Sequence, residues 1–114
     1  MITCVIRYDI DPARPELFDR YARLWGEAIP RCGADLIGYF APHEGSASTA
    51  YGIYSLPSLA AYEAYRARLR EDATGREAFA LARAERFIRA EDRLFLRLAS
   101  PPHGPKSHPE SETP

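Results

Sequence analysis

The chain has 114 residues, of which 27% are charged, and its 15 Lys and Arg against 16 Asp and Glu give a formal net charge of −1. This length fits one domain with a modest core and leaves no room for a second domain. The near-neutral balance argues against nucleic acid or an anionic membrane as the main partner, because both require a concentrated basic surface.

The chain begins MITCVIRYDIDP, and the β-branched and aromatic residues from Ile2 to Asp9 predict a first strand. The Asp11-Pro12 pair ends it, because proline disfavours helix at the residue before it. The start carries no basic leader followed by a long apolar run, and no window approaches the roughly 18 apolar residues of a membrane span. We therefore expect a cytoplasmic protein that does not bind membranes.

The two cysteines, Cys4 and Cys32, form no CxxC motif and lie far from any His-rich segment, which argues against zinc. Buried free thiols of a reducing compartment fit this spacing, although two cysteines are also enough for one disulfide. The folded body holds a single histidine, His43, and it has no glycine-rich phosphate loop and no GxSxG motif. We expect neither a metal site nor a bound cofactor.

A first helix is expected from Pro15, because proline suits the first helical position and apolar residues then recur at helical spacing. Gly33 is its expected cap. Residues 35–41 and 48–54 predict two strands of an antiparallel hairpin, since the loop between them is rich in Pro, Gly and Ser.

A second helical stripe follows Ser55 or Ser58 and is interrupted between Asp72 and Gly75, which predicts two helical pieces separated by Gly75. Arginines of this segment, including Arg66, alternate with glutamates as on a solvated face. Residues 93–98 alternate polar and apolar side chains and predict a last strand. The domain is therefore expected to span residues 1–99. Residues 100–114, with five prolines, are expected to be a disordered tail, too polar to offset the entropy of ordering.

The order strand, helix, strand, strand, helix, strand predicts a ferredoxin-like α+β domain with an antiparallel sheet. Helices cover one sheet face in such a domain, so the other face should be polar in a monomer. Both faces are apolar here: in the second strand we assign Leu36 and Phe40 to one face and Ile37 and Tyr39 to the other. A second copy packed sheet to sheet would cover the extra apolar face, which predicts a homodimeric α/β barrel.

Four segments stand out in the folded body: GYFAPHEG (38–45), SLAAYEAYRARL (58–69), GREAF (75–79) and EDRLFLRL (91–98). Together with the opening strand and first helix they resemble the NIPSNAP family, whose dimeric ferredoxin-like fold is related to antibiotic-biosynthesis monooxygenase domains. The resemblance implies the fold and the dimer. It brings no set of catalytic residues.

The GYFAPHEG segment supplies the candidate catalytic residues, because an aromatic strand there runs into a loop with an imidazole. An imidazole can take up or release a proton under ordinary conditions, and Glu44 beside His43 can stabilise the charged form. We interpret His43 and Tyr39 as proton-transfer candidates. The alternative is that His43 and Glu44 are solvated loop residues.

Aromatic and arginine side chains are the candidate ligand-binding groups. Phenols and an indole can line an apolar cavity and still donate hydrogen bonds, which applies to Tyr8, Trp25, Tyr51 and Tyr54. Arg97, with Arg7 and Arg93, lies in a strand that faces the same cleft and can hold a carboxylate. The alternatives are plain core for the aromatic residues and ion pairs at a subunit edge for the arginines.

These observations favour a homodimer that binds a small organic ligand in a cleft between sheet and helices. The mid-strand glycines Gly38 and Gly52 either leave space for that ligand or mark a bulge or a close backbone approach. The enzymatic form of this hypothesis is a cofactor-free oxygenase or isomerase, by analogy with the related barrel families. The competing hypothesis is a noncatalytic interaction or assembly module, with the Pro-rich tail as a recognition segment.

Overall fold

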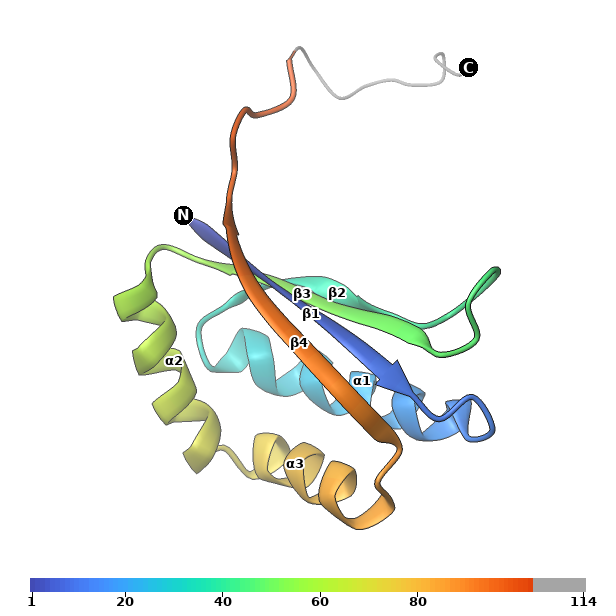
Figure 1. Ribbon diagram of the computed structural model, residues 1–114. Helices are drawn as coiled ribbons and strands as arrows, with labels where there is room; N and C mark the ends of the chain where they lie inside the picture. Colours follow the sequence, from blue (N-terminus) through green and yellow to red (C-terminus); the bar gives the residue numbers. More distant parts are fainter. Residues whose placement is uncertain (104–114) are drawn as a thin grey trace.

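The computed structural model describes residues 1–103, so most of the expected tail lies outside the described residues. A four-stranded antiparallel sheet in the order β2-β3-β1-β4 carries three helices on one face (Figure 1). The elements in chain order are β1 (Ile2–Ile10), α1 (Pro15–Arg31), β2 (Asp35–Phe40), β3 (Thr49–Leu56), α2 (Leu59–Glu71), α3 (Ala73–Glu85) and β4 (Ile88–Arg97). This confirms the predicted ferredoxin-like α+β fold, with its second helical segment divided into α2 and α3.

The core lies between the sheet and the helices. Alternation along β1 buries Cys4, Ile6, Tyr8 and Ile10, while the residues between them are exposed or half-buried. Pro15 opens α1, whose buried stripe recurs at helical spacing: Phe18, Tyr21, Trp25, Ala28 and Ile29. Both cysteines are buried free thiols, as their spacing indicated.

A β-bulge in β2 changes which of its side chains face the helices. Leu36 and Gly38 pair with successive residues of β3, so Ile37 is an extra residue in the ladder. Gly38 has a φ of 157° at this point. The bulge places Tyr39 on the same, helix-facing side as Leu36. Our assignment of Tyr39 to the opposite face was wrong, because strict alternation does not account for the extra residue.

The boundary between α2 and α3 lies at Asp72. Its carboxylate accepts a hydrogen bond of 2.9 Å from the Gly75 N–H and pairs with Arg31 at 2.9 Å, which starts α3 with a capped N-terminus. The expected break at Gly75 was therefore placed three residues too late. Gly75 lies inside the first turn of α3, where a Cβ would stand 2.9 Å from the Leu69 carbonyl oxygen.

The sheet face opposite the helices is apolar and uncovered in this structure. Strand register places six side chains there that we call the open-face patch: Val5, Phe40, Tyr51, Ile53, Leu94 and Leu96. Phe40 and Leu94 are each 48% exposed, and Leu96 is 52% exposed. The homodimer expected from this pattern stays a prediction. Within residues 1–103, no helix is both long and apolar enough to cross a membrane.

Candidate functional site

A cavity of about 300 Å³ lies between the sheet and the helices. All seven helices and strands contribute to its wall, because the helix-facing residues of the strands and the inward stripes of the helices converge there. Its volume is at the lower end of the range of small-molecule sites, about 300–1,000 Å³. Much of the lining is apolar: Ile6, Ile29, Leu69, Phe79, Ala82 and Ile88.

Tyrosines form the principal polar lining of the cavity. Five of them contribute, from β1, α1, β2, β3 and α2 respectively: Tyr8, Tyr21, Tyr39, Tyr54 and Tyr65. The hydroxyl oxygens of Tyr8 and Tyr39 are hydrogen-bonded at 3.2 Å. The ring of Tyr8 also packs edge-on against Tyr21, with centroids 5.9 Å apart. These contacts hold the rings in place, so the cavity has a defined shape.

Burial determines the protonation state of these phenols. It raises the pKa of Tyr8 and of Tyr39 well above the usual value of a phenol, because a phenolate would lose its hydration. Burial likewise raises the pKa of the other three phenols, those of Tyr21, Tyr54 and Tyr65. All five are therefore neutral at physiological pH. They can donate hydrogen bonds to a ligand, but none is suited to act as a phenolate base.

Trp25 contributes a hydrogen-bond donor that has no partner among the described residues. The residue is 3% exposed, and its Nε1 is buried without an acceptor. Tyr21 and Phe79 pack edge-on against its ring, with centroid distances of 5.8 and 5.0 Å. Burial raises the pKa of the Tyr21 phenol, and a contact with the Trp25 N–H partly offsets that rise, but this contact does not have the geometry of a hydrogen bond. The indole N–H is therefore available to an acceptor on a ligand.

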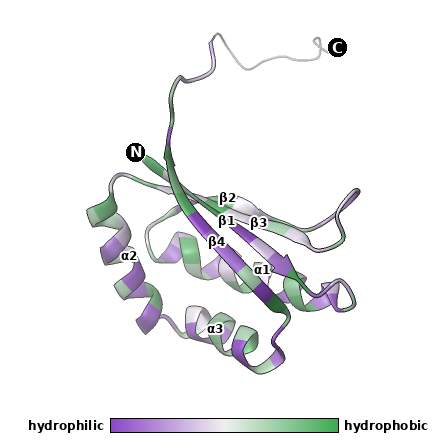
Figure 2. Cartoon of the chain, viewed as in Figure 1, coloured by the Kyte–Doolittle hydropathy of each residue, from purple (hydrophilic) through white to green (hydrophobic). Residues whose placement is uncertain are grey.

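Charged side chains line the same cavity. Arg66 comes from α2, Arg83 from α3, and Glu91 and Arg93 from β4, whose middle is a hydrophilic stretch (Figure 2). Arg93 pairs with Glu91 at 2.7 Å. Arg66 and Arg93 each donate to the Tyr62 hydroxyl oxygen, at 3.0 and 3.1 Å. One phenol therefore orients two guanidinium groups, one from α2 and one from β4.

The structure brings four of the predicted site residues together in this cavity: Tyr8, Trp25, Tyr39 and Tyr54. The others lie elsewhere. Tyr51 belongs to the open-face patch, Arg97 is exposed at the end of β4, and Glu44 is exposed in the β2–β3 loop. Their proposed contacts with a ligand in this cavity have no support from their positions.

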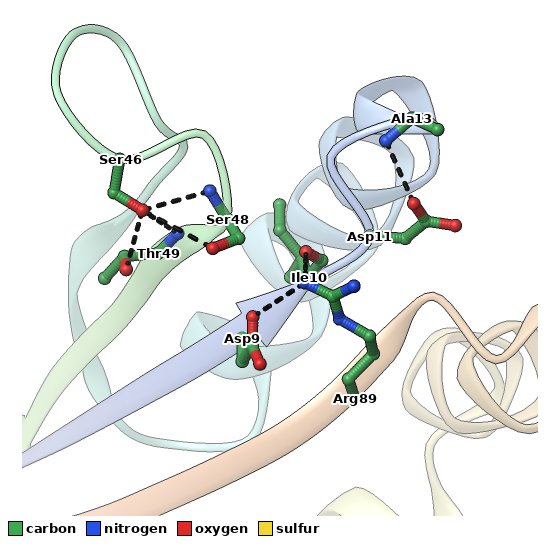
Figure 3. A network of polar contacts seen from close by, with 8 residues as sticks. All are labelled: Asp9, Ile10, Asp11, Ala13, Ser46, Ser48, Thr49 and Arg89. Carbon is green, nitrogen blue, oxygen red and sulfur yellow. Dashed lines mark hydrogen bonds and ion pairs between the residues drawn. The ribbon is translucent and has the colours of Figure 1, made fainter.

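His43 lines a second depression of about 380 Å³, which it shares with Phe18 and Asp19. At the base of the same loop, the Ser46 hydroxyl oxygen accepts hydrogen bonds of 3.1 Å from the N–H groups of Ser48 and Thr49 (Figure 3). Phe18 is buried and packs on the ring of Tyr39, which lines the main cavity. His43 and Tyr39 therefore line different depressions, although they are four residues apart in the sequence.

Sequence reasoning did not find the roles of Arg66 and Tyr65. Both belong to the helical stripe of α2, but we interpreted Arg66 as part of a solvated charged face. In the structure Arg66 lines the cavity and its Nε is buried without a partner among the described residues. The available signal was the position of an arginine directly beside a tyrosine in an otherwise apolar stripe.

A ferredoxin-like α+β domain with a tyrosine-lined cavity between sheet and helices defines the structural class of this protein. The family profile of NIPSNAP matches residues 4–101. The chain belongs to the NIPSNAP family. A comparison with curated proteins gave no match.

Solved structures share this fold. A protein of Agrobacterium tumefaciens matches with a TM-score of 0.74 and 20% identity, covering 87% of this chain and 94% of that one. A putative antibiotic biosynthesis monooxygenase of Nitrosomonas europaea has a TM-score of 0.68 and 9% identity, covering 88% and 100%. A variant of SnoaB, a cofactor-independent oxygenase of Streptomyces nogalater, has a TM-score of 0.56 and 15% identity, covering 90% and 97%. At these identities the likeness concerns the fold.

Proposed function

We propose that the chain forms a homodimer that binds a small organic ligand in the cavity between sheet and helices. We further propose that it acts on this ligand without a bound cofactor, as an oxygenase or an isomerase. The observation that carries the proposal is the lining of the cavity, which combines five neutral phenols with the unpartnered indole N–H of Trp25. A few fixed donors in an apolar space are typical of a small-molecule site.

The chemistry that these donors favour is stabilisation of negative charge on a ligand oxygen. A neutral phenol held in place can donate a hydrogen bond to an oxygen that becomes enolate-like during the reaction. Tyr39 and Tyr8 suit this role, because their hydroxyls already touch each other at 3.2 Å and burial keeps both protonated. The described cofactor-independent activity of SnoaB is consistent with such a reaction on the same fold, and here it is a proposal by analogy.

The open-face patch supports the homodimer. Phe40, Leu94 and Leu96 expose about half of their surface to solvent on one continuous sheet face. Exposed apolar faces of this kind mark association surfaces, and a second identical sheet offers a matching partner across a twofold axis. In that arrangement each protomer keeps its own cavity on the opposite, helix-covered side of the sheet.

The test follows the single tryptophan of the chain, whose indole N–H gives one signal in proton–nitrogen NMR spectra. Neutral aromatic ketones and phenols are titrated as probes, together with aromatic carboxylates. We expect at least one to shift the Trp25 signal saturably, and Tyr39→Phe to weaken its binding by about fivefold to tenfold through the lost hydrogen bond. Tyr51→Phe removes a phenol outside the cavity, on the open face. It is the control, and it should bind the probe as the wild type does when sedimentation shows its assembly to be unchanged.

Turnover is then measured as oxygen consumption or isomer formation with the compounds that bind. Binding without turnover would contradict the enzymatic part of the proposal and leave a ligand-binding protein. A Trp25 signal that no probe class moves would contradict ligand binding as well. The noncatalytic interaction module would then be the better hypothesis.

A further inference from the structure

We propose that the ligand of the cavity is an organic carboxylate with an apolar body, and that Arg66 and Arg93 hold its carboxylate group. This inference rests on the proposed ligand-binding function and specifies its substrate class. Three independent features of the lining carry it: two guanidinium groups that converge, an excess of positive charge, and buried donors that have no acceptor.

The first feature is the convergence of Arg66 and Arg93. Arg66 reaches from α2 and Arg93 from β4, and both donate to the hydroxyl oxygen of Tyr62, at 3.0 and 3.1 Å. Tyr62 is held by the ring of Phe95, whose centroid is 4.8 Å away. A neutral phenol oxygen carries no charge to balance them, and among the described residues only Arg93 of the two has a carboxylate partner, Glu91 at 2.7 Å. The Arg66 guanidinium therefore favours an anion bound beside the Tyr62 hydroxyl.

The second feature is the charge of the cavity wall. Three arginines line it, Arg66, Arg83 and Arg93, against the single carboxylate of Glu91. Glu91 is already engaged by Arg93 at 2.7 Å. Within residues 1–103, neither Arg66 nor Arg83 forms an ion pair. The lining therefore carries an excess of positive charge, which an anionic ligand would balance.

The third feature is a set of buried donors that need an acceptor. Arg66 Nε and Trp25 Nε1 are the buried side-chain donors without a hydrogen-bond partner in the described part of the chain. They lie on α2 and α1, on different walls of one cavity. A carboxylate carries only acceptors, and a guanidinium can bind both of its oxygens through two parallel N–H donors. The donor set therefore matches an anion better than an alcohol or an amine.

The rest of the cavity lining determines the polarity and size of the ligand's body. Apolar and aromatic side chains such as Leu69, Phe79 and Tyr54 surround the space behind the arginines. The total volume is about 300 Å³, which suits a compact body of one or two rings or a short branched chain. An aromatic or aliphatic monocarboxylate meets both requirements.

The experiment compares trans-cinnamate with trans-cinnamamide, which share a body and differ in charge. Each is titrated into the full chain while the Trp25 indole N–H signal is followed. We expect cinnamate to bind at least about tenfold more tightly than the amide, since hydrogen bonds to a charged group are worth about 1.5–3 kcal/mol. Arg66→Gln should remove that preference. Arg70→Gln, one turn further along α2 on its exposed side, is the matched control and should keep it.

Each outcome separates this inference from the proposed function. If the amide binds as tightly as cinnamate, or if Arg66→Gln leaves the preference unchanged, the carboxylate assignment is overturned while the cavity remains a ligand site. If neither compound nor any neutral probe moves the Trp25 signal, both fail. Arg93→Gln gives an independent reading should Arg66→Gln not fold, as judged by circular dichroism, and it should also lose the preference for the carboxylate.

Discussion

The ring of Tyr39 lies directly against the backbone of Gly52, its partner in the β2–β3 ladder. A Cβ at position 52 would stand 2.6 Å from Cζ of that ring, closer than any relaxed contact. The missing side chain lets the ring approach the β3 backbone closely, and the Tyr39 hydroxyl is hydrogen-bonded to that of Tyr8. Gly52 therefore allows Tyr39 to approach the backbone closely. A close approach was one of the alternatives that the sequence left for this glycine.

Replacing Gly52 by alanine should displace the Tyr39 ring and break its hydrogen bond to Tyr8. We expect Gly52→Ala to lower the free energy of unfolding by about 1–3 kcal/mol, the usual cost of overpacking, and to weaken ligand binding. Urea unfolding and the Trp25 titration measure the two effects. Gly26→Ala is the matched control, since a Cβ there meets nothing within 4 Å. It should stabilise α1 by about 0.5–1 kcal/mol, because alanine is the better helix former.

The open-face patch makes a separate prediction about assembly. Leu94→Glu places a charge in the middle of the proposed sheet-to-sheet interface, where it would be buried without a partner. We expect the dimer dissociation constant to rise by at least about tenfold, with the fold unchanged. Sedimentation velocity over a range of concentrations measures it. Leu59→Glu replaces a residue of similar exposure, 56%, on α2 outside the patch and should leave the assembly intact. Equal sedimentation of all three proteins would exclude this face as the interface.

Asp72 links helix capping to the pH dependence of stability. Its hydrogen bonds from Arg31, and then that from the Gly75 N–H, lower the pKa of its carboxyl to about 2. A pKa that is lower in the folded state stabilises the fold above the unfolded value of about 3.9 and ceases to do so as pH falls toward about 2. Asp72→Ala should therefore cost about 1 kcal/mol at neutral pH, as the loss of an N-cap does.

The difference in unfolding free energy between wild type and Asp72→Ala should narrow between about pH 4 and about pH 2. Urea unfolding at several pH values measures it. Asp35→Ala is the control, since Asp35 is exposed at the start of β2 and caps no helix. Its difference from wild type should be small at every pH. A constant difference between wild type and Asp72→Ala would show that ionisation of the Asp72 carboxyl does not contribute to stability.

Sequence periodicity predicted the fold and part of the cavity. Alternation in β1 placed Tyr8, and helical spacing in α1 placed Trp25, because both elements are regular over their whole length. Periodicity failed where the backbone is irregular: the extra residue Ile37 reverses the facing of Tyr39. Periodicity also failed for Arg66. An arginine on a charged helix gives the same sequence pattern whether its guanidinium group lies in solvent or in a cavity beneath the sheet.

The position of His43 allows a test of the two proton-transfer candidates, His43 and Tyr39. His43 is exposed and lines a different depression from Tyr39, with the buried ring of Phe18 packed against Tyr39. If the reaction takes place in the main cavity, His43→Ala should leave turnover and the Trp25 titration unchanged, whereas Tyr39→Phe should lower both.

The same two variants are compared with the wild type, and sedimentation tests whether all three proteins have the same assembly. A loss of turnover of about tenfold or more in His43→Ala, with binding unchanged, would assign proton transfer to His43 and require its loop to move toward the cavity. An unchanged rate in Tyr39→Phe would instead remove the Tyr8–Tyr39 pair from the chemistry. Steady-state rates with the compound that shifts the Trp25 signal decide between these outcomes, because they separate turnover from binding.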